Sequence, residues 1–115
     1  MEDRFSQQMK KGVLEMLVLK LICQRPTYGY DLLLQLKEQS HGRFVLKEGT
    51  LYPILYRLED DGMIVAKWSQ GAGRVAPKKM YEATEAGVLE NIRRQSVWQE
   101  FTETVNSFLT GGCIE

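Results

Sequence analysis

The sequence predicts a mostly helical α+β fold, in which one folded domain is followed by a long helix. Three observations lead to this prediction. Apolar residues recur at steps of three and four in four segments, which is typical of amphipathic helices. Two short strand-like segments flank a loop that contains two glycines and a proline. The 115 residues, 43% of them hydrophobic, suit one compact core. We expect the domain at residues 1–83 and the C-terminal helix with a short tail at residues 84–115.

The first helix is expected from Phe5 to Gln24, and Pro26 then stops it. Its second half is apolar on nearly every side. A helix of this kind is buried on more than one side, so we expect it to contact its own domain and also to contribute to a dimer.

The second helix is expected to begin at Thr27 as an N-cap residue, within TYGYDLLLQLKEQ, and to end at the Ser40-His41-Gly42 turn. Its leucines are expected to face inward. The segment Phe44-Val45-Leu46 that follows is short for a strand but is able to pair at a sheet edge.

The third helix is expected in GTLYPILYRLEDDG, starting near Gly49 or Thr50 and ending at Gly62. Such a start places Pro53 in the opening turn, where backbone N–H groups have no intrahelical partner and proline is tolerated. Four apolar residues fall on one face of this helix and are predicted to be core. They are Leu51, Ile54, Leu55 and Leu58.

Two strands are expected at residues 63–69 and 78–83, around the loop QGAGRVAP. The last helix is expected to begin at Thr84, an N-cap residue, and to end at Gly111-Gly112. Some 26 helical residues span about 40 Å, more than a small domain covers with its own surface. The helix carries an apolar stripe that predicts a two-fold dimer. This stripe consists of Val88, Ile92, Trp98, Phe101, Val105 and Phe108.

The order helix, helix, short strand, helix, strand, loop, strand, long helix is that of a winged helix-turn-helix domain with a two-stranded wing and a C-terminal dimerisation helix. In such a domain the third helix enters a DNA major groove and the wing lies on the adjacent backbone. The net charge of the chain is zero, yet residues 62–81 contain four basic residues and no acidic one. One face is therefore suited to DNA phosphates.

Several other classes of protein are not supported. No run of eighteen apolar residues and no secretory signal is seen, so we expect a cytoplasmic protein without a membrane span. Cys23 and Cys113 are the only cysteines and His41 is the only histidine, so neither a metal site nor a disulfide framework is expected. With no catalytic triad and no phosphate-binding glycine loop, we expect no enzyme activity and no cofactor.

Three segments resemble the PadR family of bacterial winged-helix transcriptional regulators: PTYGYDLLLQLKE, EGTLYPILYRLEDDGMI and KKMYEATEAG. The resemblance implies a dimeric repressor that binds a palindromic operator and releases it when a small, often aromatic, molecule binds. It places the recognition helix on residues 49–58 and the wing on residues 70–79. It also implies that Tyr28 contacts the DNA backbone and that Trp98 lines a ligand pocket at the dimer interface.

The expected DNA contacts combine outward-facing residues of the third helix with nearby cations. They are Tyr28, Lys47, Gly49, Thr50, Tyr52, Pro53, Tyr56, Arg57, Arg74, Lys78 and Lys79. The expected ligand contacts are Met9, Trp98 and Phe101, with no metal ligand and no catalytic residue.

Four alternatives stay open. Tyr52 is either a core-edge aromatic or a sugar-phosphate contact, and Trp98 either stacks on a ligand or only packs at the interface. Arg57 either contacts DNA or pairs with Asp60 or Asp61. The wing ends in PKKMY where the family usually has RRKYY, and Glu82 stands where a basic residue is common. This departure keeps a second function open, a winged-helix module that binds protein without binding specific DNA.

Overall fold

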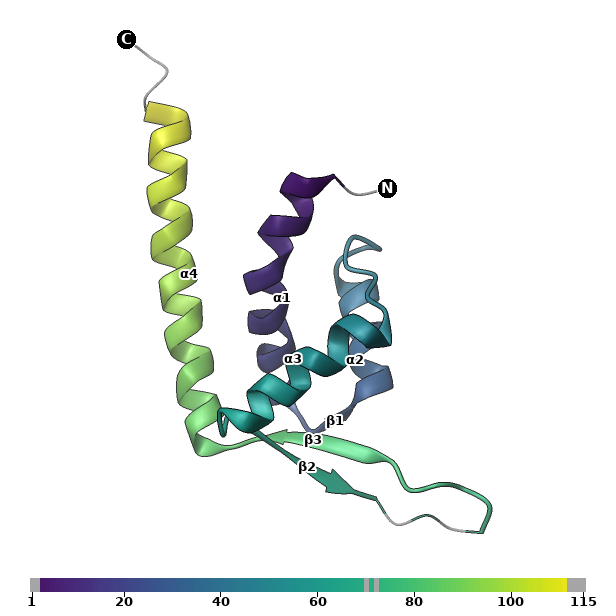
Figure 1. Cartoon of the computed structure of the whole chain (residues 1–115). Coiled ribbons are helices and arrows are strands. Elements are labelled where there is room, and N and C mark those ends of the chain that lie inside the picture. Colours follow the sequence, from purple (N-terminus) through teal and green to yellow (C-terminus); the bar gives the residue numbers. More distant parts are fainter. Residues whose placement is uncertain (1–2, 70, 72, 112–115) are drawn as a thin grey trace.

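The computed structural model describes residues 3–69, 71 and 73–111 and contains four helices and a small antiparallel sheet in that part of the chain (Figure 1). The elements, in order, are α1 (Arg4–Gln24), β1 (Thr27–Tyr28), α2 (Gly29–Gln39), α3 (Glu48–Asp60), β2 (Ile64–Trp68), β3 (Lys79–Ala83) and α4 (Glu85–Gly111). The predicted mostly helical α+β fold is confirmed. Gly112 and Cys113, which belong to the predicted tail, lie outside the described residues.

The core lies between the C-terminal half of α1, α2, the inner face of α3 and the sheet. The four residues predicted as the core face of α3 are all buried, at 0–4% exposure. In α1 the buried residues begin at Leu14, whereas Phe5 and Met9 near its start are exposed. The first half of α1 therefore leaves an apolar face uncovered by its own chain.

Thr27 is not the N-cap of the second helix, and this prediction was wrong. Thr27 and Tyr28 form strand β1, which pairs antiparallel with β3 (Thr27 opposite Tyr81), so the sheet order is β1-β3-β2. The strand forms because it gives hydrogen-bond partners to the second edge of β3, which would otherwise be open. The Oγ1 atom of Thr27 instead accepts a hydrogen bond from Nε2 of Gln35 at 3.4 Å.

The segment Phe44-Val45-Leu46 forms no strand, so the expectation that it pairs at a sheet edge was also wrong. The backbone N–H of Phe44 donates to Oγ of Ser40 at 2.8 Å, which closes the turn after α2. Phe44 and Leu46 pack their side chains against the core. The segment is fixed by these contacts rather than by strand pairing.

The third helix starts one or two residues earlier than predicted, and this changes the explanation of Pro53. Because α3 begins at Glu48, Pro53 is its sixth residue, beyond the opening turn. The N–H groups of Thr50 and Leu51 already donate to the carbonyl oxygen of Lys47, at 2.9 and 3.1 Å. Pro53 thus removes a hydrogen bond that would reach the carbonyl of Gly49. Both residues are exposed, so water can satisfy that carbonyl.

Gly62 ends α3 as predicted. Its φ is +76°, its N–H donates to the carbonyl of Glu59 at 3.0 Å, and the N–H of Met63 donates to the carbonyl of Leu58 at 2.9 Å. This pair of bonds is a Schellman motif, which satisfies carbonyls that the helix leaves without partners. The chain turns here directly into β2.

The start of α4 is seated on this same turn. Thr84 caps the helix as predicted, because its Oγ1 accepts a hydrogen bond from the N–H of Gly87 at 3.0 Å and donates to the carbonyl of Gly62 at 2.6 Å. Gly87 lies against the Met63 carbonyl so closely that a Cβ there would overlap its oxygen. From residue 95 to 111, every residue of α4 except Thr102 is exposed.

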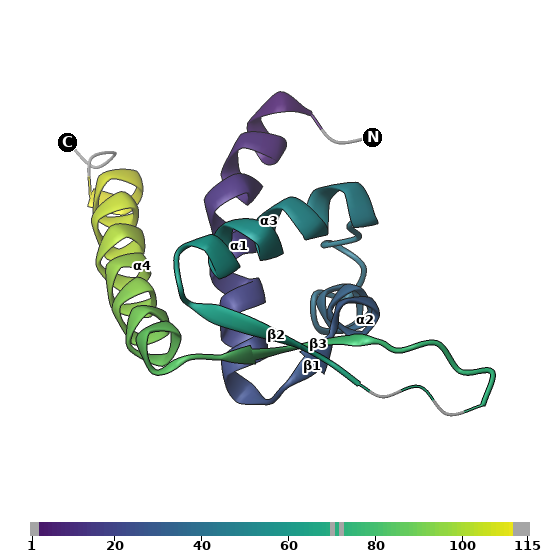
Figure 2. The ribbon, with the colours of Figure 1, turned by 60° about the horizontal axis from the view of Figure 1, so that its bottom comes forward.

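The loop between β2 and β3 projects beyond the helices, on the side away from α4 (Figures 1 and 2). Among the described residues, no helix is both long enough and apolar enough to cross a membrane.

We expect Gly87→Ala to destabilise the fold by about 1–3 kcal/mol, because the new methyl group collides with backbone that is itself fixed by the Thr84 cap. The free energy of unfolding is measured by urea denaturation at one fixed protein concentration. The matched control is Gly12→Ala. Gly12 is also helical, but a Cβ there meets nothing within 4 Å. This control is expected to be neutral or to stabilise by up to about 1 kcal/mol. Equal effects of the two substitutions would contradict the close packing of α4 on Met63.

Candidate nucleic-acid interface

The outward face of α3 is exposed, whereas its inner face is fully buried. Gly49, Thr50, Pro53, Tyr56 and Arg57 are all exposed along it. A Cβ built on Gly49 meets nothing within 4 Å, so this protein's own fold does not require glycine there. The glycine leaves the backbone bare near the start of α3, where a helix also presents N–H groups and a partial positive charge. This end of α3 can approach a phosphate or a base edge closely.

Tyr52 lies at the edge of the core rather than on the outward face. It is half-buried, and its hydroxyl lies 2.7 Å from where a Cβ on Gly29 would stand. Its ring is 6.3 Å from the ring of Tyr56. Tyr52 therefore packs α3 against the first turn of α2, which also explains why glycine follows Tyr28. A contact of Tyr52 with DNA stays a prediction.

The wing lysines extend over aromatic rings of β1 and α3. The Nζ atom of Lys78 lies 5.7 Å from the ring centroid of Tyr28, and that of Lys79 lies 5.7 Å from that of Tyr56. Lys79 also pairs with Glu59 at 3.5 Å and is half-buried, whereas Lys78 is exposed. Cation–π contacts of this kind hold a cation in place without neutralising it. The two lysines thus join the wing to the start of α2 and the end of α3.

Arg57 pairs with neither Asp60 nor Asp61, so that alternative was wrong. Its Nε instead donates to Oε1 of Glu15 on α1 at 3.1 Å. The guanidinium reaches α1 because α1 and α3 pack together. The sequence does not indicate this contact, because Glu15 and Arg57 are 42 residues apart. More than half of the Arg57 side-chain surface stays exposed.

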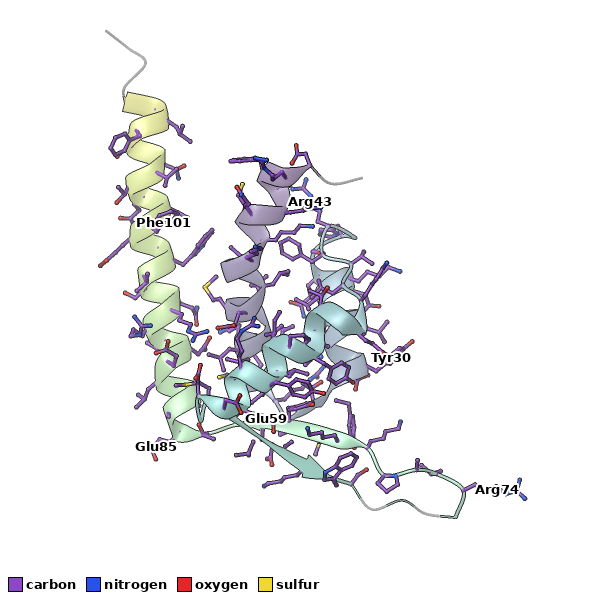
Figure 3. The ribbon with its side chains drawn as sticks, in the orientation of Figure 1. Tyr30, Arg43, Glu59, Arg74, Glu85 and Phe101 are labelled. Atoms are coloured by element: carbon purple, nitrogen blue, oxygen red, sulfur yellow. The ribbon has the colours of Figure 1, made fainter. Side chains whose placement is uncertain are left out.

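At the far end of the wing, Arg74 points away from the helices (Figure 3). Gln70 and Ala72 of the predicted wing lie outside the described residues. Further back, Lys67 of β2 pairs with Glu82 of β3 at 2.6 Å. The acidic residue at this unusual position therefore neutralises a cation of the hairpin.

A basic groove beside α3 includes two cations that the sequence reasoning missed. The groove, of about 760 Å³, brings Lys10 and Lys11 of α1 next to Lys47, Pro53 and Arg57. Lys10 donates to the carbonyl of Arg43 at 2.9 Å. The adjacent lysines are visible in the sequence, but only the packing of α1 beside α3 shows that they share a surface with Lys47.

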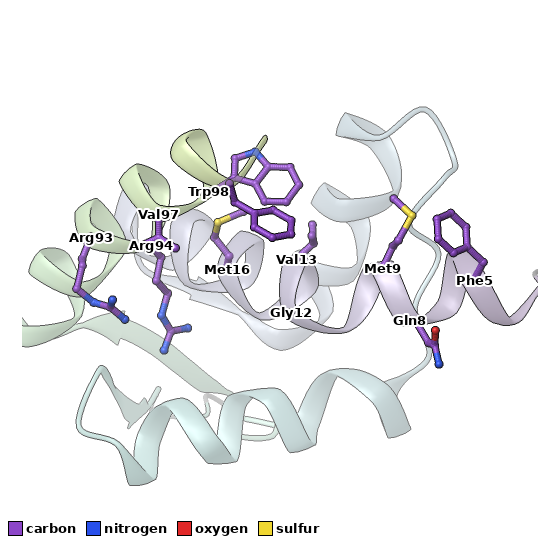
Figure 4. Close-up of a pocket in the computed structure, with 11 residues that line it drawn as sticks. Phe5, Gln8, Met9, Gly12, Val13, Met16, Arg93, Arg94, Val97 and Trp98 are labelled. Atoms are coloured by element: carbon purple, nitrogen blue, oxygen red, sulfur yellow. The ribbon is translucent and has the colours of Figure 1, made fainter. Parts of the chain in front are cut away.

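A second groove, of about 560 Å³, lies between α1 and α4 and brings the three predicted ligand contacts together (Figure 4). Met9 comes from α1, and Trp98 and Phe101 come from α4. The other apolar residues that line it are Phe5, Val13, Met16 and Val97, and the lining side chains that carry polar groups are Gln8, Arg93 and Arg94. The predicted ligand contacts were Met9, Trp98 and Phe101 alone, so Phe5, Val13, Met16 and Val97 were not foreseen as lining residues.

The arginines of this groove are held by carboxylates. Arg93 and Arg94 both donate to Glu90, at 2.8 and 2.6 Å, and Nη1 of Arg94 also donates to Oε2 of Glu15 at 3.1 Å. Hydrogen bonds from Arg93, which has the larger effect, and from Arg94 lower the pKa of the Glu90 carboxyl to about 2. Both arginines point away from the aromatic residues, toward the side on which α3 lies (Figure 4).

The six residues of the predicted dimer stripe on α4 are all exposed, between 38% and 75%. Leu89, Val97 and Leu109 on the same helix are exposed as well, although they fall outside the predicted stripe. Large apolar patches on soluble proteins mark interaction surfaces. Among the described residues, no three His, Cys, Asp or Glu side chains are grouped so that they could hold a metal ion.

A family model and solved structures identify the family to which this chain is similar. A family model described as the transcriptional regulator PadR-like family matches residues 18–91. An uncharacterized protein of Lysinibacillus sphaericus is 30% identical over 104 residues, which are 88% of this chain and 92% of that protein. The crystal structure of a PadR-like transcriptional regulator from Bacillus cereus has a TM-score of 0.75 and 32% identity, covering 90% of this chain and 97% of that one. That of a PadR family regulator from Eggerthella lenta has a TM-score of 0.82 and 28% identity, covering 92% and 89%.

Proposed function

The chain belongs to the PadR-like family of transcriptional regulators, whose model covers well over half of it, and from this premise we propose that it is a dimeric repressor that binds a palindromic DNA operator. The observation that carries the proposal is the two-sided α3. Its leucine face is buried. Its other face is exposed, with no polar side chain at Gly49 and Pro53, and lies beside a groove lined by Lys10, Lys11, Lys47 and Arg57.

The proposed contact places the outward face of α3 in a major groove. Pro53 and Tyr56 offer apolar contact to thymine methyl groups or sugars, while Lys47 and Arg57 approach phosphates. The projecting wing brings Arg74 onto the neighbouring backbone or minor groove. The ammonium group of Lys78 lies over the ring of Tyr28, so the start of α2 and the wing present one continuous surface to the same DNA strand.

The proposed dimer forms through α4 and the first half of α1. Both elements expose apolar residues that their own chain does not cover, and the two line one groove. A two-fold axis along this surface would set two α3 helices on successive major grooves, which a palindromic operator requires. Repression then follows from occupation of the operator by the dimer.

The proposed effector is a flat aromatic molecule that binds the groove between α1 and α4 and releases the protein from DNA. The groove is largely apolar, and Trp98 and Phe101 supply faces on which an aromatic ring can stack. Met9 supplies a flexible side chain that adapts to different ring shapes. We propose no enzymatic step, no cofactor and a cytoplasmic location, where chromosomal DNA is accessible.

One observation favours the second candidate function, a module that binds protein instead of DNA. Carboxylates pair with several cations of the candidate interface: Glu15 with Arg57, Glu59 with Lys79 and Glu82 with Lys67. This lowers the positive potential of a chain whose net charge is already zero. Salt dependence separates the two functions, because counterion release accompanies DNA binding at phosphates.

We expect the protein to bind a duplex from the region upstream of its own gene, with affinity that falls steeply as salt rises. Lys47→Ala and Arg74→Ala are each expected to lower the slope of log affinity against log salt by about 1 per protomer, hence about 2 per dimer. Fluorescence anisotropy at several salt concentrations measures this.

The control for this experiment is Lys20→Ala. Lys20 lines a groove on the side of α1 that faces α2, among residues of neither α3 nor the wing. The slope of this variant is expected to match that of the wild type. Absence of binding to the upstream duplex at low salt would favour the protein-binding module.

We expect sedimentation equilibrium to give twice the mass of one chain, and Phe101→Glu to shift the protein toward the monomer. Phe101 is 60% exposed within its own chain, so a charge there leaves the protomer core intact but is costly in an apolar interface. Gln99→Glu, which adds the same charge at an exposed polar position, is the control. A wild type that sediments as a monomer at high micromolar concentration would overturn the proposed dimer.

We expect planar aromatic compounds to quench the fluorescence of Trp98. Trp68 is exposed at the end of β2, so Trp68→Phe removes the other tryptophan at little cost and leaves Trp98 as the only reporter. In the reverse variant, Trp98→Phe, the remaining tryptophan is expected to show no quenching by the same compounds. If no member of a broad panel quenches Trp98, the residue only packs at the interface.

A further inference from the structure

One carboxylate connects the helix of the candidate DNA face with the helix of the candidate effector groove. Glu15, on α1, accepts from Nε of Arg57 on α3 through one oxygen and from Nη1 of Arg94 on α4 through the other, both at 3.1 Å. The side chain of Glu15 is only 22% exposed, so water screens these pairs less than it screens pairs on an open surface. Three helices therefore meet at a single ionised group.

The two arginines differ in what else surrounds them. Arg57 lines the basic groove beside α3 and keeps 57% of its side-chain surface exposed, so a phosphate can reach it. Arg94 is 23% exposed, lines the apolar groove and also donates to Glu90. A molecule that enters the apolar groove contacts the side chain of Arg94, whose guanidinium points toward α3 (Figure 4), and does not contact Arg57.

The charges determine the direction of the effect. Glu15 carries one negative charge, which two cations share in this arrangement. If Arg94 is drawn away, Arg57 becomes the sole cation that neutralises Glu15, and its attraction to Glu15 increases. Arg57 is then less available to a phosphate, because the two anions compete for one guanidinium. Withdrawal of Arg94 thus weakens DNA binding without any contact between Arg94 and DNA.

We propose that Glu15 is a positioning residue for Arg57 and that Arg94 determines how strongly Glu15 attracts Arg57. Displacement of Arg94 within the groove then lowers the affinity of the protein for DNA. This inference rests on the proposed DNA binding and supplies it with a route from the groove to α3. The coupling depends on two direct ion pairs, from Arg57 to Glu15 and from Arg94 to Glu15.

The test is a double-mutant cycle in DNA affinity, measured on the full chain with the upstream duplex. Arg94→Gln is compared with Arg93→Gln. Arg93 is the matched control because it lines the same groove, carries the same charge and binds Glu90, but forms no ion pair with Glu15. We expect Arg94→Gln to weaken DNA binding about fivefold more than Arg93→Gln. In a Glu15→Gln background that difference is expected to disappear.

The salt slope gives a readout that a merely structural role would not move. Arg94→Gln is expected to lower the slope by up to about 2 per dimer, as if phosphate contacts had been lost, although Arg94 lies outside the DNA face. Arg93→Gln is expected to leave the slope unchanged. Urea denaturation and stoichiometric titration of each variant ensure that affinities refer to folded protein.

If Glu15→Gln does not fold, Arg57→Ala serves as the second background, and there too the difference between the Arg94 and Arg93 variants is expected to vanish. A difference that persists in either background would overturn the coupling through Glu15. Wild-type protein that binds DNA while Arg94→Gln and Arg93→Gln behave alike would overturn this inference alone. Wild-type protein that shows no salt-dependent binding would overturn the proposed function and this inference together.

Discussion

The burial of the leucine face of α3 is the constraint on which the other features depend. Leu51, Leu55 and Leu58 are fully buried, so the rotation of α3 about its own axis is fixed, and with it the set of residues that face outward. Truncating a core leucine typically costs about 2–5 kcal/mol, a large fraction of the stability of a small domain. The helix therefore cannot roll to present another face. Tyr52 on Gly29 and the Schellman turn at Gly62 hold its two ends in the same orientation.

Local sequence patterns predicted the elements that local physics determines. The leucine periodicity of α3, the stop at Gly62 and the Thr84 cap all depend on residues within one or two helical turns, and each was confirmed. Strand β1 was missed because two residues form a strand only when a partner strand, more than fifty residues later, lies beside them. The start of α3 was predicted one or two residues late, since Pro53 was taken as a marker of the opening turn.

The sequence predicted which residues belong to the candidate site better than it predicted their hydrogen-bond and ion-pair partners. The exposed side of α3 followed from its periodicity, and the three candidate ligand contacts do line one groove. The partner of Arg57 was not predictable, because Glu15 lies 42 residues away, whereas Asp60 and Asp61 lie only three and four residues from Arg57. The net charge of zero also gives no sign that cations gather beside α3 while carboxylates from α1, α3 and β3 pair with some of them.

The double role of Thr84 has a mechanical consequence. Its side chain joins the last turn of α3 to the first turn of α4, so the two helices share one rigid joint. Beyond residue 94, nearly every residue of α4 is exposed, so the helix extends from this joint as a lever arm. For an arm of about 40 Å, a tilt of about 5° at the joint displaces the far end by about 3 Å. Conversely, a displacement of about 3 Å at the far end of α4 corresponds to a rotation of only about 5° at the joint with α3. The length of α4 therefore determines how strongly movements along this helix change the orientation of α3.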